Sequence, residues 1–248
     1  MTDPMKHERL RGRIRYTSKK PEMLDKVRGD EIFNITRHSD GAVTVRAHCE
    51  IHEPAPTVLR DIVYSMDKNL NPLDCHVRLV VGDEFMGSGW FRFDLDEDRN
   101  GVIECESYGP SIGRMSQTMP TRGPFDGFGT HPIIGDALMC KVIDRAGGPT
   151  RRNIRVFLPS PDHRGATPPM VSEVSIGLEY VGDETQTVEA GTFDCHHFRY
   201  VDDSGPGMGG KQHPTYDMWV TKDDFLFVKG GVGGYMATWY ELVELERR

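Results

Sequence analysis

The chain has 248 residues, of which 37% are hydrophobic, 27 are glycine and 16 are proline. No Ser- or Pro-rich linker divides it, so we expect one domain over residues 1–248, built of short strands and long loops. A net charge of −8 argues against a nucleic-acid partner, no apolar run is long enough for a membrane span, and the basic N-terminus lacks the apolar core of a secretory signal. These features predict a cytoplasmic protein without a membrane partner.

The first half of the chain alternates apolar and polar residues with a period of two, which is typical of β-strands. Arginine alternates with other residues over 9–16 and a polar stretch follows, so we expect residues 1–29 to be peripheral and partly mobile. Gly87 and Gly89 share one face of a strand, which predicts strong curvature or the close approach of another element. A meander of antiparallel strands is predicted over residues 31–36, 42–52, 58–67, 73–81, 84–93, 102–108 and 113–119.

Residues 131–145 are the only long segment whose apolar residues do not alternate, and they predict the one substantial helix. Pro132 suits its first turn, and Gly147 and Gly148 stop it. Apolar side chains fall all round the helix axis, which is the pattern of a buried helix. Asp136 would therefore lie in an apolar setting.

The β pattern resumes after the helix, with strands expected over residues 151–158, 172–182, 185–188, 193–201, 216–221, 225–229 and 235–245. A glycine-rich stretch over residues 202–211 predicts a mobile loop. The predicted fold class is mainly β, with a strongly curved antiparallel sheet, a half-barrel or barrel, wrapped around one central helix.

Two motifs that resemble cofactor sites do not meet the requirements of those sites. Residues 205–211 match a phosphate-loop string, but Gln212 stands where Ser or Thr should bind magnesium, and no helix follows. In Cys195-His196-His197 only the first and third side chains share a strand face, so a zinc ion would need further ligands from elsewhere. We expect no metal and no cofactor, and the five scattered cysteines suit reduced, buried thiols.

The segment over residues 160–169 contains several side chains that can act as acids, bases or anion-binding groups. Asp162 can orient His163 as a base, and Arg164 can hold an anionic or phenolic oxygen. The alternative is a turn stabilised by Asp162 with His163 exposed to solvent. Aromatic residues on the C-terminal strands can line a pocket for a flat ligand, although a packed barrel core has the same composition.

Several segments together resemble a poorly characterised group of bacterial proteins loosely similar to the DUF3108 family. These segments are GSGWFRF (87–93), GTHPIIGD (129–136), SPDHRGAT (160–167), AGTFD (190–194) and GGYMAT (233–238). The resemblance implies a curved antiparallel half-barrel that encloses a helix, a shape similar to lipoprotein carriers and lipid-binding proteins. It makes ligand binding plausible and specifies no chemistry.

The absence of nucleotide, haem, flavin and metal motifs favours acid–base chemistry without a cofactor. The predicted function is a lyase or isomerase that acts on a small, partly aromatic metabolite in the half-barrel. Candidate bases are His131 and His163. The other candidate site residues are Asp136 and Asp162 as orienting or proton-holding carboxyls, Tyr235 as an acid, Arg92, Arg164 and Lys229 as charge stabilisers, and Trp90, Tyr216 and Trp219 as substrate-binding residues.

Three alternatives stay open at this point. His131 can simply begin the helix, and Arg92 can be a surface residue. The rival function is a non-catalytic carrier or sensor of an apolar small molecule, in a cavity without perturbed acids or bases. A homodimer is the one protein partner considered.

Overall fold

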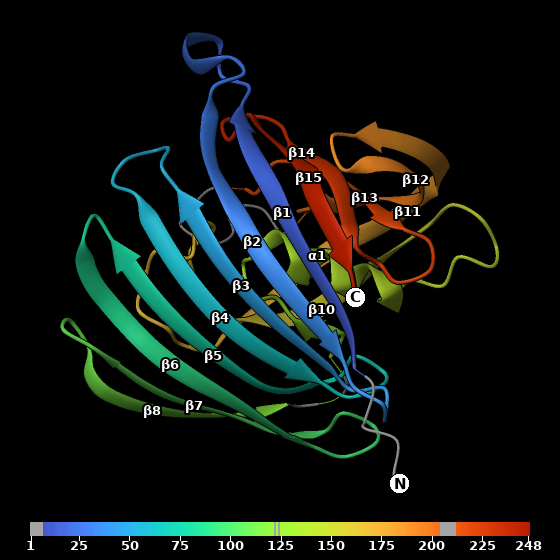
Figure 1. The fold of residues 1–248 in the computed structure, drawn as a ribbon. Helices are drawn as coiled ribbons and strands as arrows, with labels where there is room; N and C mark the ends of the chain where they lie inside the picture. Colours follow the sequence, from blue (N-terminus) through green and yellow to red (C-terminus); the bar gives the residue numbers. More distant parts are fainter. Residues whose placement is uncertain (1–6, 122, 124, 204–211) are drawn as a thin grey trace, which may run out of the picture.

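The computed structural model describes residues 7–121, 123, 125–203 and 212–248, and it contains one large, strongly curved sheet around a short helix (Figure 1). Strands β8 to β1 lie side by side in reverse chain order, β1 then pairs with β15, and β15 to β9 complete the 15-stranded sheet. Every neighbouring pair is antiparallel except β9 and β10, which are parallel. The predicted mainly β class, with a curved antiparallel sheet around one helix, is confirmed.

The first part of the sheet consists of β1 (Glu8–Ser18), β2 (Val27–Arg37), β3 (Val43–Ile51), β4 (Val58–Met66), β5 (Pro72–Val81), β6 (Glu84–Leu95), β7 (Gly101–Gly109) and β8 (Gly113–Thr121). The second part consists of β9 (Gly127–Phe128), β10 (Thr150–Leu158), β11 (Ser172–Val188), β12 (Gly191–Val201), β13 (Tyr216–Thr221), β14 (Phe227–Val232) and β15 (Thr238–Arg247). The helical segments are the 3-10 turn η1 (Pro21–Met23), the helix α1 (Ile133–Met139) and the 3-10 turn η2 (Cys140–Val142).

Alternation sets which side chains face the helix. In β3, Val43, Val45 and Ala47 are buried on the inner face, whereas Arg46 between them is exposed. Because successive side chains of a strand point to opposite faces, each strand contributes every second residue to one continuous interior. The buried faces of strands from both parts of the sheet join in a single hydrophobic core with α1.

The helix is shorter than predicted. His131 has a positive φ of 70° and Pro132 is extended, so α1 begins only at Ile133. At the other end the chain tightens into η2 and becomes extended at Ile143, so residues 143–145 are not helical. The burial of Ile133, Ile134, Gly135, Ala137 and Leu138 confirms the prediction of a buried helix.

Two expectations about the sheet need correction. Strand β1, predicted to be peripheral, lies in the middle of the sheet, where it pairs with β2 on one side and β15 on the other. Within the described part of residues 1–29, it is the β1–β2 connection with η1 that projects from the body, at the top of Figure 1. The two short strands predicted over residues 172–188 are one strand, β11, with an irregularity between Tyr180 and Gly182.

The paired glycines of β6 mark a close approach, as predicted. A Cβ atom added at Gly89 would lie 2.6 Å from Cβ of Pro169, and one at Gly87 would lie 2.8 Å from Cδ of the same proline. The loop before β11 therefore packs directly on the inner face of β6. No helix in the described ranges is long and apolar enough to cross a membrane. The predicted mobile loop and the phosphate-loop string fall largely or wholly on residues 204–211, outside the described residues.

Candidate functional site

A cavity of about 560 Å³ lies between the curved sheet, α1 and the loop before β11. Most of its wall is apolar, and the apolar lining residues are Ile51, Pro54, Ile133, Met139, Val156, Leu158, Val174, Ile176, Val232 and Met236. Lys20, from the projecting β1–β2 connection, and Tyr235, from the β14–β15 connection, also line it. A volume of this size fits a small organic ligand.

Four tyrosines form one side of the cavity. The rings of Tyr16 and Tyr240 meet edge to face at 4.9 Å, Tyr216 lies 6.0 Å from Tyr240, and Tyr200 stacks on Tyr216 at 5.8 Å. The Tyr200 hydroxyl donates to the main-chain oxygen of Asp136 at 2.9 Å. In contrast, the Tyr216 hydroxyl is buried and has no hydrogen-bond partner in the described part of the chain, in a residue that is 6% exposed.

A buried carboxyl group, Glu31, holds the start of α1. Its Oε2 accepts hydrogen bonds from the main-chain N–H of Ile133 at 2.7 Å and from the Tyr16 hydroxyl at 2.8 Å, and its Oε1 accepts from the N–H of Ile134 at 3.1 Å. Burial raises the pKa of Glu31, and these hydrogen bonds oppose that rise. Glu31 thus takes the place of an N-cap side chain that the helix itself lacks.

His131 and Asp136 both line the cavity, and burial shifts their pKa values in opposite directions. The pKa of His131 is well below its usual range, because burial disfavours the imidazolium and the charges of Arg60 and His163 repel it. The pKa of Asp136 is well above its usual range, because of burial and of the nearby Glu31. Nε2 of His131 is buried without a partner among the described residues. The pair therefore combines a neutral imidazole with a carboxyl group that resists ionisation.

The loop over residues 159–171 brings further polar groups to the cavity. Asp162 accepts hydrogen bonds from the N–H of Arg164 at 3.1 Å and of Ala166 at 2.7 Å, so its carboxylate stabilises the turn. His163 lies edge to face with His213, with 5.0 Å between the ring centroids. Arg164 donates to the main-chain oxygens of Pro54 and Pro56. Asp162 thus shapes the loop, while His163 and Arg164 line the cavity wall.

Seven of the predicted site residues line this one cavity: His131, Asp136, Asp162, His163, Arg164, Tyr216 and Tyr235. Their convergence is a fact of geometry, and the roles assigned to them stay predictions. Tyr235 is about half exposed at the cavity rim, so it is accessible to a ligand that enters.

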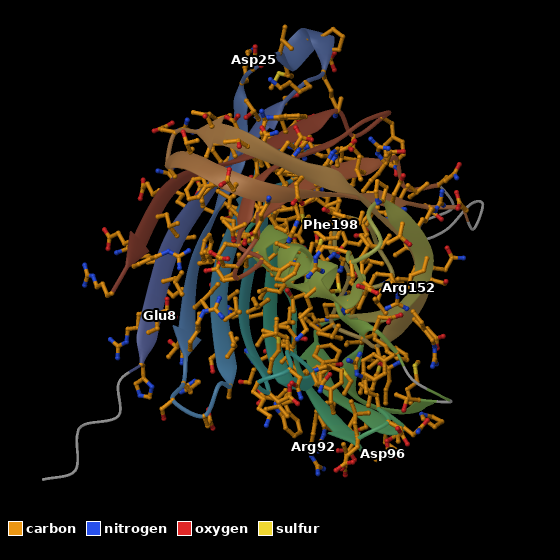
Figure 2. The ribbon with its side chains drawn as sticks, turned by 90° about the vertical axis from the view of Figure 1, so that its right-hand side faces the viewer. Glu8, Asp25, Arg92, Asp96, Arg152 and Phe198 are labelled. Carbon is orange, nitrogen blue, oxygen red and sulfur yellow. The ribbon has the colours of Figure 1, made fainter. Side chains whose placement is uncertain are left out.

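Four predicted site residues do not line the cavity, because they lie on the opposite face of their strands. Arg92 forms ion pairs with Asp94 and Glu104, and Figure 2 places it at the lower end of the molecule, away from the helix. Trp90, two residues earlier on the same face, is 42% exposed. Trp219 stacks on His197, and Lys229 lies over the ring of Trp239. The prediction that these four residues bind the ligand of this cavity is therefore wrong.

Sequence reasoning missed the charged residues that reach the cavity from the first strands. Arg60, which is 2% exposed, lies on the inner face of β4. Arg28 comes from β2, and Lys20 comes from the connection between β1 and β2. Glu31, Cys49 and Arg60 are register partners across β2, β3 and β4. The sequence does contain a signal for two of these positions, because alternate residues of a strand share a face. Glu31 shares a face with the buried Phe33, and Arg60 shares a face with the buried Val58 and Ile62.

No group of three His, Cys, Asp or Glu side chains in the described ranges is arranged to hold a metal ion. His197, the candidate partner of Cys195, instead contacts Glu184 at 3.1 Å and Asp217 at 2.8 Å. On the other side of the strand, Asp183 binds His196 at 2.6 Å and Lys222 at 2.7 Å. These histidines are mostly buried, and they belong to ion-pair clusters whose residues do not line the cavity.

Comparison with known proteins gives a fold and no activity. No protein-family model and no curated protein sequence matches the chain. A β-barrel-like protein of the domain of unknown function DUF1849 from Brucella abortus is similar in structure, with a TM-score of 0.57, 12% identity, and coverage of 98% of each chain. This similarity supports a general resemblance to bacterial β-barrel-like proteins of unknown function, and the specific resemblance to DUF3108 stays a prediction.

Two further structures are more distant. They are a proposed lipoprotein from Parabacteroides distasonis, with a TM-score of 0.34, 8% identity, and coverage of 96% of this chain and 94% of that one, and a proposed exported protein with a YmcC-like fold from Bacteroides fragilis, with a TM-score of 0.32, 10% identity, and coverage of 97% and 95%. At these scores neither supports an argument about this chain.

Proposed function

We propose that the protein is a cofactor-independent lyase or isomerase that binds a small, partly aromatic molecule in the cavity and moves protons on it. The observation that carries the proposal is the pair His131 and Asp136, which line one cavity with pKa values shifted in opposite directions. Such a split is typical of sites where one group takes a proton and another supplies one.

The simplest reaction begins with neutral His131 as the base. It takes a proton from a carbon next to a carbonyl group of the substrate, and protonated Asp136 supplies a proton to the resulting enolate. If that proton goes to a different carbon, the product is an isomer. If instead the electron pair of the broken C–H bond forms a C=C bond, a leaving group on the next carbon departs with the electron pair of its own bond and takes the proton from Asp136, and the reaction is an elimination. His163 is the second candidate base, and Tyr235 is a second candidate acid at the rim.

The backbone at His131 supports this assignment. Its φ of 70° lies in the left-handed region, which is uncommon for a residue with a side chain. Residues held in that region cost free energy and cluster at functional sites. The same geometry places His131 one residue before Pro132, the N-cap of α1, so a purely structural role at the start of the helix stays the alternative.

The test uses carbon–hydrogen exchange, which needs no knowledge of the full reaction. The full chain is incubated in D₂O with a panel of aryl ketones and aryl hydroxyketones, and exchange at carbons next to the carbonyl is followed by proton NMR. We expect exchange or turnover of at least one compound, which survives dialysis against EDTA. His131→Gln and Asp136→Asn should each lower the rate about 100-fold or more.

The controls separate catalysis from folding. Arg92→Gln changes an outer-face residue and should leave the rate unchanged, and His163→Gln tests the second base. If His131→Gln and His163→Gln both keep the wild-type rate, the assignment of an acid–base site is wrong. Loss of activity on chelation, with recovery on adding zinc, would also contradict it.

The second candidate function is a carrier or sensor of an apolar molecule, and the predominantly apolar lining of the cavity favours it. A compound that co-purifies with the protein, identified by native mass spectrometry and returned chemically unchanged after long incubation in D₂O, would favour the carrier. A cytoplasmic location and a homodimer are part of the same proposal and rest on the sequence alone.

A further inference from the structure

We propose that the ligand of the cavity carries a permanent anionic group, a carboxylate or a phosphate, and that the buried guanidinium of Arg60 binds it. This inference deepens the proposed function and rests on the cavity being a ligand site. It holds equally for an enzyme and for a carrier.

The first step of the argument is the burial of Arg60. Its side chain is among the largest fully buried ones, at 2% exposure, and it lines the cavity from β4. A guanidinium stays charged in a protein, and a buried charge without a counter-ion costs free energy. Buried arginines are therefore normally paired with a carboxylate.

The second step is that Arg60 has no such partner. Its Nη2 donates to the main-chain oxygens of Arg164 at 2.7 Å and Gly165 at 2.9 Å. Nε and Nη1 carry the other three N–H groups, and none of these has a hydrogen bond or ion pair in the described part of the chain. Two neutral carbonyl oxygens satisfy part of the hydrogen-bonding capacity and do not balance the charge.

The third step is that the nearby carboxyl groups do not supply the missing charge. Glu31, two strands away on the same inner row, binds the start of α1 and Tyr16. Asp162 accepts bonds from the main chain of its own loop. Glu53 contacts Lys20 at 2.5 Å and Arg28 at 3.6 Å. Asp136 forms no ion pair with Arg60 in the described chain. The charge of Arg60 opposes the rise in the pKa of Asp136, but burial, the larger effect, keeps that pKa raised and favours the neutral form.

The surroundings of Arg60 extend the positive character of this region. A Cβ atom added at Gly165, which has a φ of 61°, would lie 2.4 Å from Nη2 of Arg60 and 2.8 Å from Cδ2 of His131. Arg60 and His131 therefore both pack on this glycine. Arg164 and Arg28 line the same cavity. An anionic group here would balance Arg60, while the body of the ligand would lie against the apolar and tyrosine walls.

The alternative role of Arg60 is purely structural, as a clamp on the loop over residues 159–171. That role uses only Nη2 and explains neither the three remaining N–H groups nor the position on the cavity wall. It also makes a different prediction, because a clamp gives no preference between charged and neutral ligands.

The experiment compares two fluorescent probes that differ by one anionic group. 1-Anilinonaphthalene-8-sulfonate and N-phenyl-1-naphthylamine share their aromatic body, and only the first carries a sulfonate. We expect the folded wild-type chain to bind the sulfonate at least about tenfold more tightly, the effect of one charged hydrogen-bonded contact. Equal affinities would overturn the inference, and this comparison needs no mutation.

A displacement series then identifies the anion. Decanoate, decyl phosphate and decanol compete with the bound sulfonate probe, and the inference requires that decanol be the weakest by about tenfold. A stronger effect of decanoate identifies a carboxylate ligand, and a stronger effect of decyl phosphate identifies a phosphate. Equal displacement by all three would contradict the inference.

Variants complete the test. Arg60→Gln should abolish the preference for the sulfonate while the affinity for the neutral probe stays within about twofold, and Arg60→Lys should keep part of the preference. Arg92→Gln is the matched outer-face control. Circular dichroism verifies the fold of each variant, and if Arg60→Gln does not fold, the comparison of the two probes decides.

The results also distinguish this inference from the proposed function. A preference for anions without carbon–hydrogen exchange would support this inference and contradict the proposed enzyme. Exchange on neutral ketones without a preference for anions would support the enzyme and contradict this inference.

Discussion

Two clusters of aromatic residues face the inside of the same sheet, and they are built from different residues. On the side of β6, β9 and β10 the rings are mostly phenylalanine, and Phe128 lies 5.0 Å from Phe93, 5.2 Å from Phe91 and 6.0 Å from Tyr64. On the side of β1, β12, β13 and β15 the rings are the four tyrosines of the cavity. The first cluster borders a hollow of about 20 Å³, and the second borders an open space of about 560 Å³.

We expect the phenylalanine cluster to contribute mainly to the stability of the fold and the tyrosine cluster mainly to ligand binding. The phenyl ring of phenylalanine has no polar atom and can be buried without a hydrogen bond, whereas a buried tyrosine has a hydroxyl that needs a hydrogen-bond partner. Substitutions in the phenylalanine cluster should therefore change the free energy of unfolding, and substitutions around the cavity should change ligand binding and pH dependence more than stability.

The largest effect is expected for Phe128→Ala. Phe128 is fully buried and contacts three aromatic rings, so removing its side chain leaves a large cavity in the core. We expect a loss of about 3–5 kcal/mol in the free energy of unfolding, measured by urea denaturation. Tyr235→Ala, at a half-exposed ring on the cavity rim, is the control and should change it by less than about 0.5 kcal/mol. A loss below about 1 kcal/mol for Phe128→Ala would show that the two clusters do not differ in packing.

A smaller loss is expected for Glu31→Gln, which tests the carboxyl group that joins the tyrosine wall to α1. An amide has one acceptor oxygen where the carboxylate has two, so at least one of the donors from Ile133, Ile134 or Tyr16 loses its partner. We expect a loss of about 1–3 kcal/mol in the free energy of unfolding. Glu50→Gln, on the outer face of the neighbouring strand, is the matched control. An increase in stability for Glu31→Gln would contradict the capping role.

Asp136→Asn, unlike the two substitutions above, should raise the stability of the protein, and only at high pH. Burial raises the pKa of Asp136 above its usual 3.8, so the folded protein keeps a proton that the unfolded chain releases. The stability from this group is therefore complete below about pH 4 and is lost as the pH rises through the raised pKa. Asparagine has no proton to lose, so we expect the variant to melt at least about 3 °C above the wild type at pH 8, and close to it at pH 4.5.

The control for this comparison is Asp94→Asn, at a carboxylate that is exposed on the outer face of β6. It should shift the melting temperature equally at both pH values. Parallel curves for Asp136→Asn and the wild type would mean that Asp136 is ionised without cost, and the acid assigned to the proposed site would lose its support.

The alternation of apolar residues was sufficient to predict most strands, but not their long-range partners. The position of β1 depends on pairing with β15, more than 200 residues away, and no local pattern encodes that pairing. The start of α1 depends on the left-handed backbone of His131 and on Glu31, which caps the helix from strand β2. The two-residue strand β9 is too short to leave a periodic signal.

The candidate site was predictable where a residue lies in a loop or on the helix, and less so on strands. Periodicity shows which residues share a face, but not which face points inward. For Arg92 the sequence does contain the answer, because Phe91 and Phe93 alternate with it and are the buried pair. The same reasoning applied to Arg60 would have placed its charged side chain on the inner face of the sheet. Charged side chains are rarely buried, so such a position points to a function.

The smallest change in stability is expected for Tyr216→Phe. The Tyr216 hydroxyl is buried without a partner in the described chain, and a buried hydroxyl without a hydrogen bond lowers stability. Removing it should leave the free energy of unfolding unchanged or raise it by up to about 1 kcal/mol. Tyr16→Phe is the matched control, because the Tyr16 hydroxyl donates to Glu31 at 2.8 Å and its removal should cost about 1 kcal/mol. If the two variants lose equal stability, the Tyr216 hydroxyl already has a partner in the free protein. If only Tyr16→Phe loses stability, the Tyr216 hydroxyl is available to a ligand, which is the property that distinguishes the tyrosine cluster from the phenylalanine cluster.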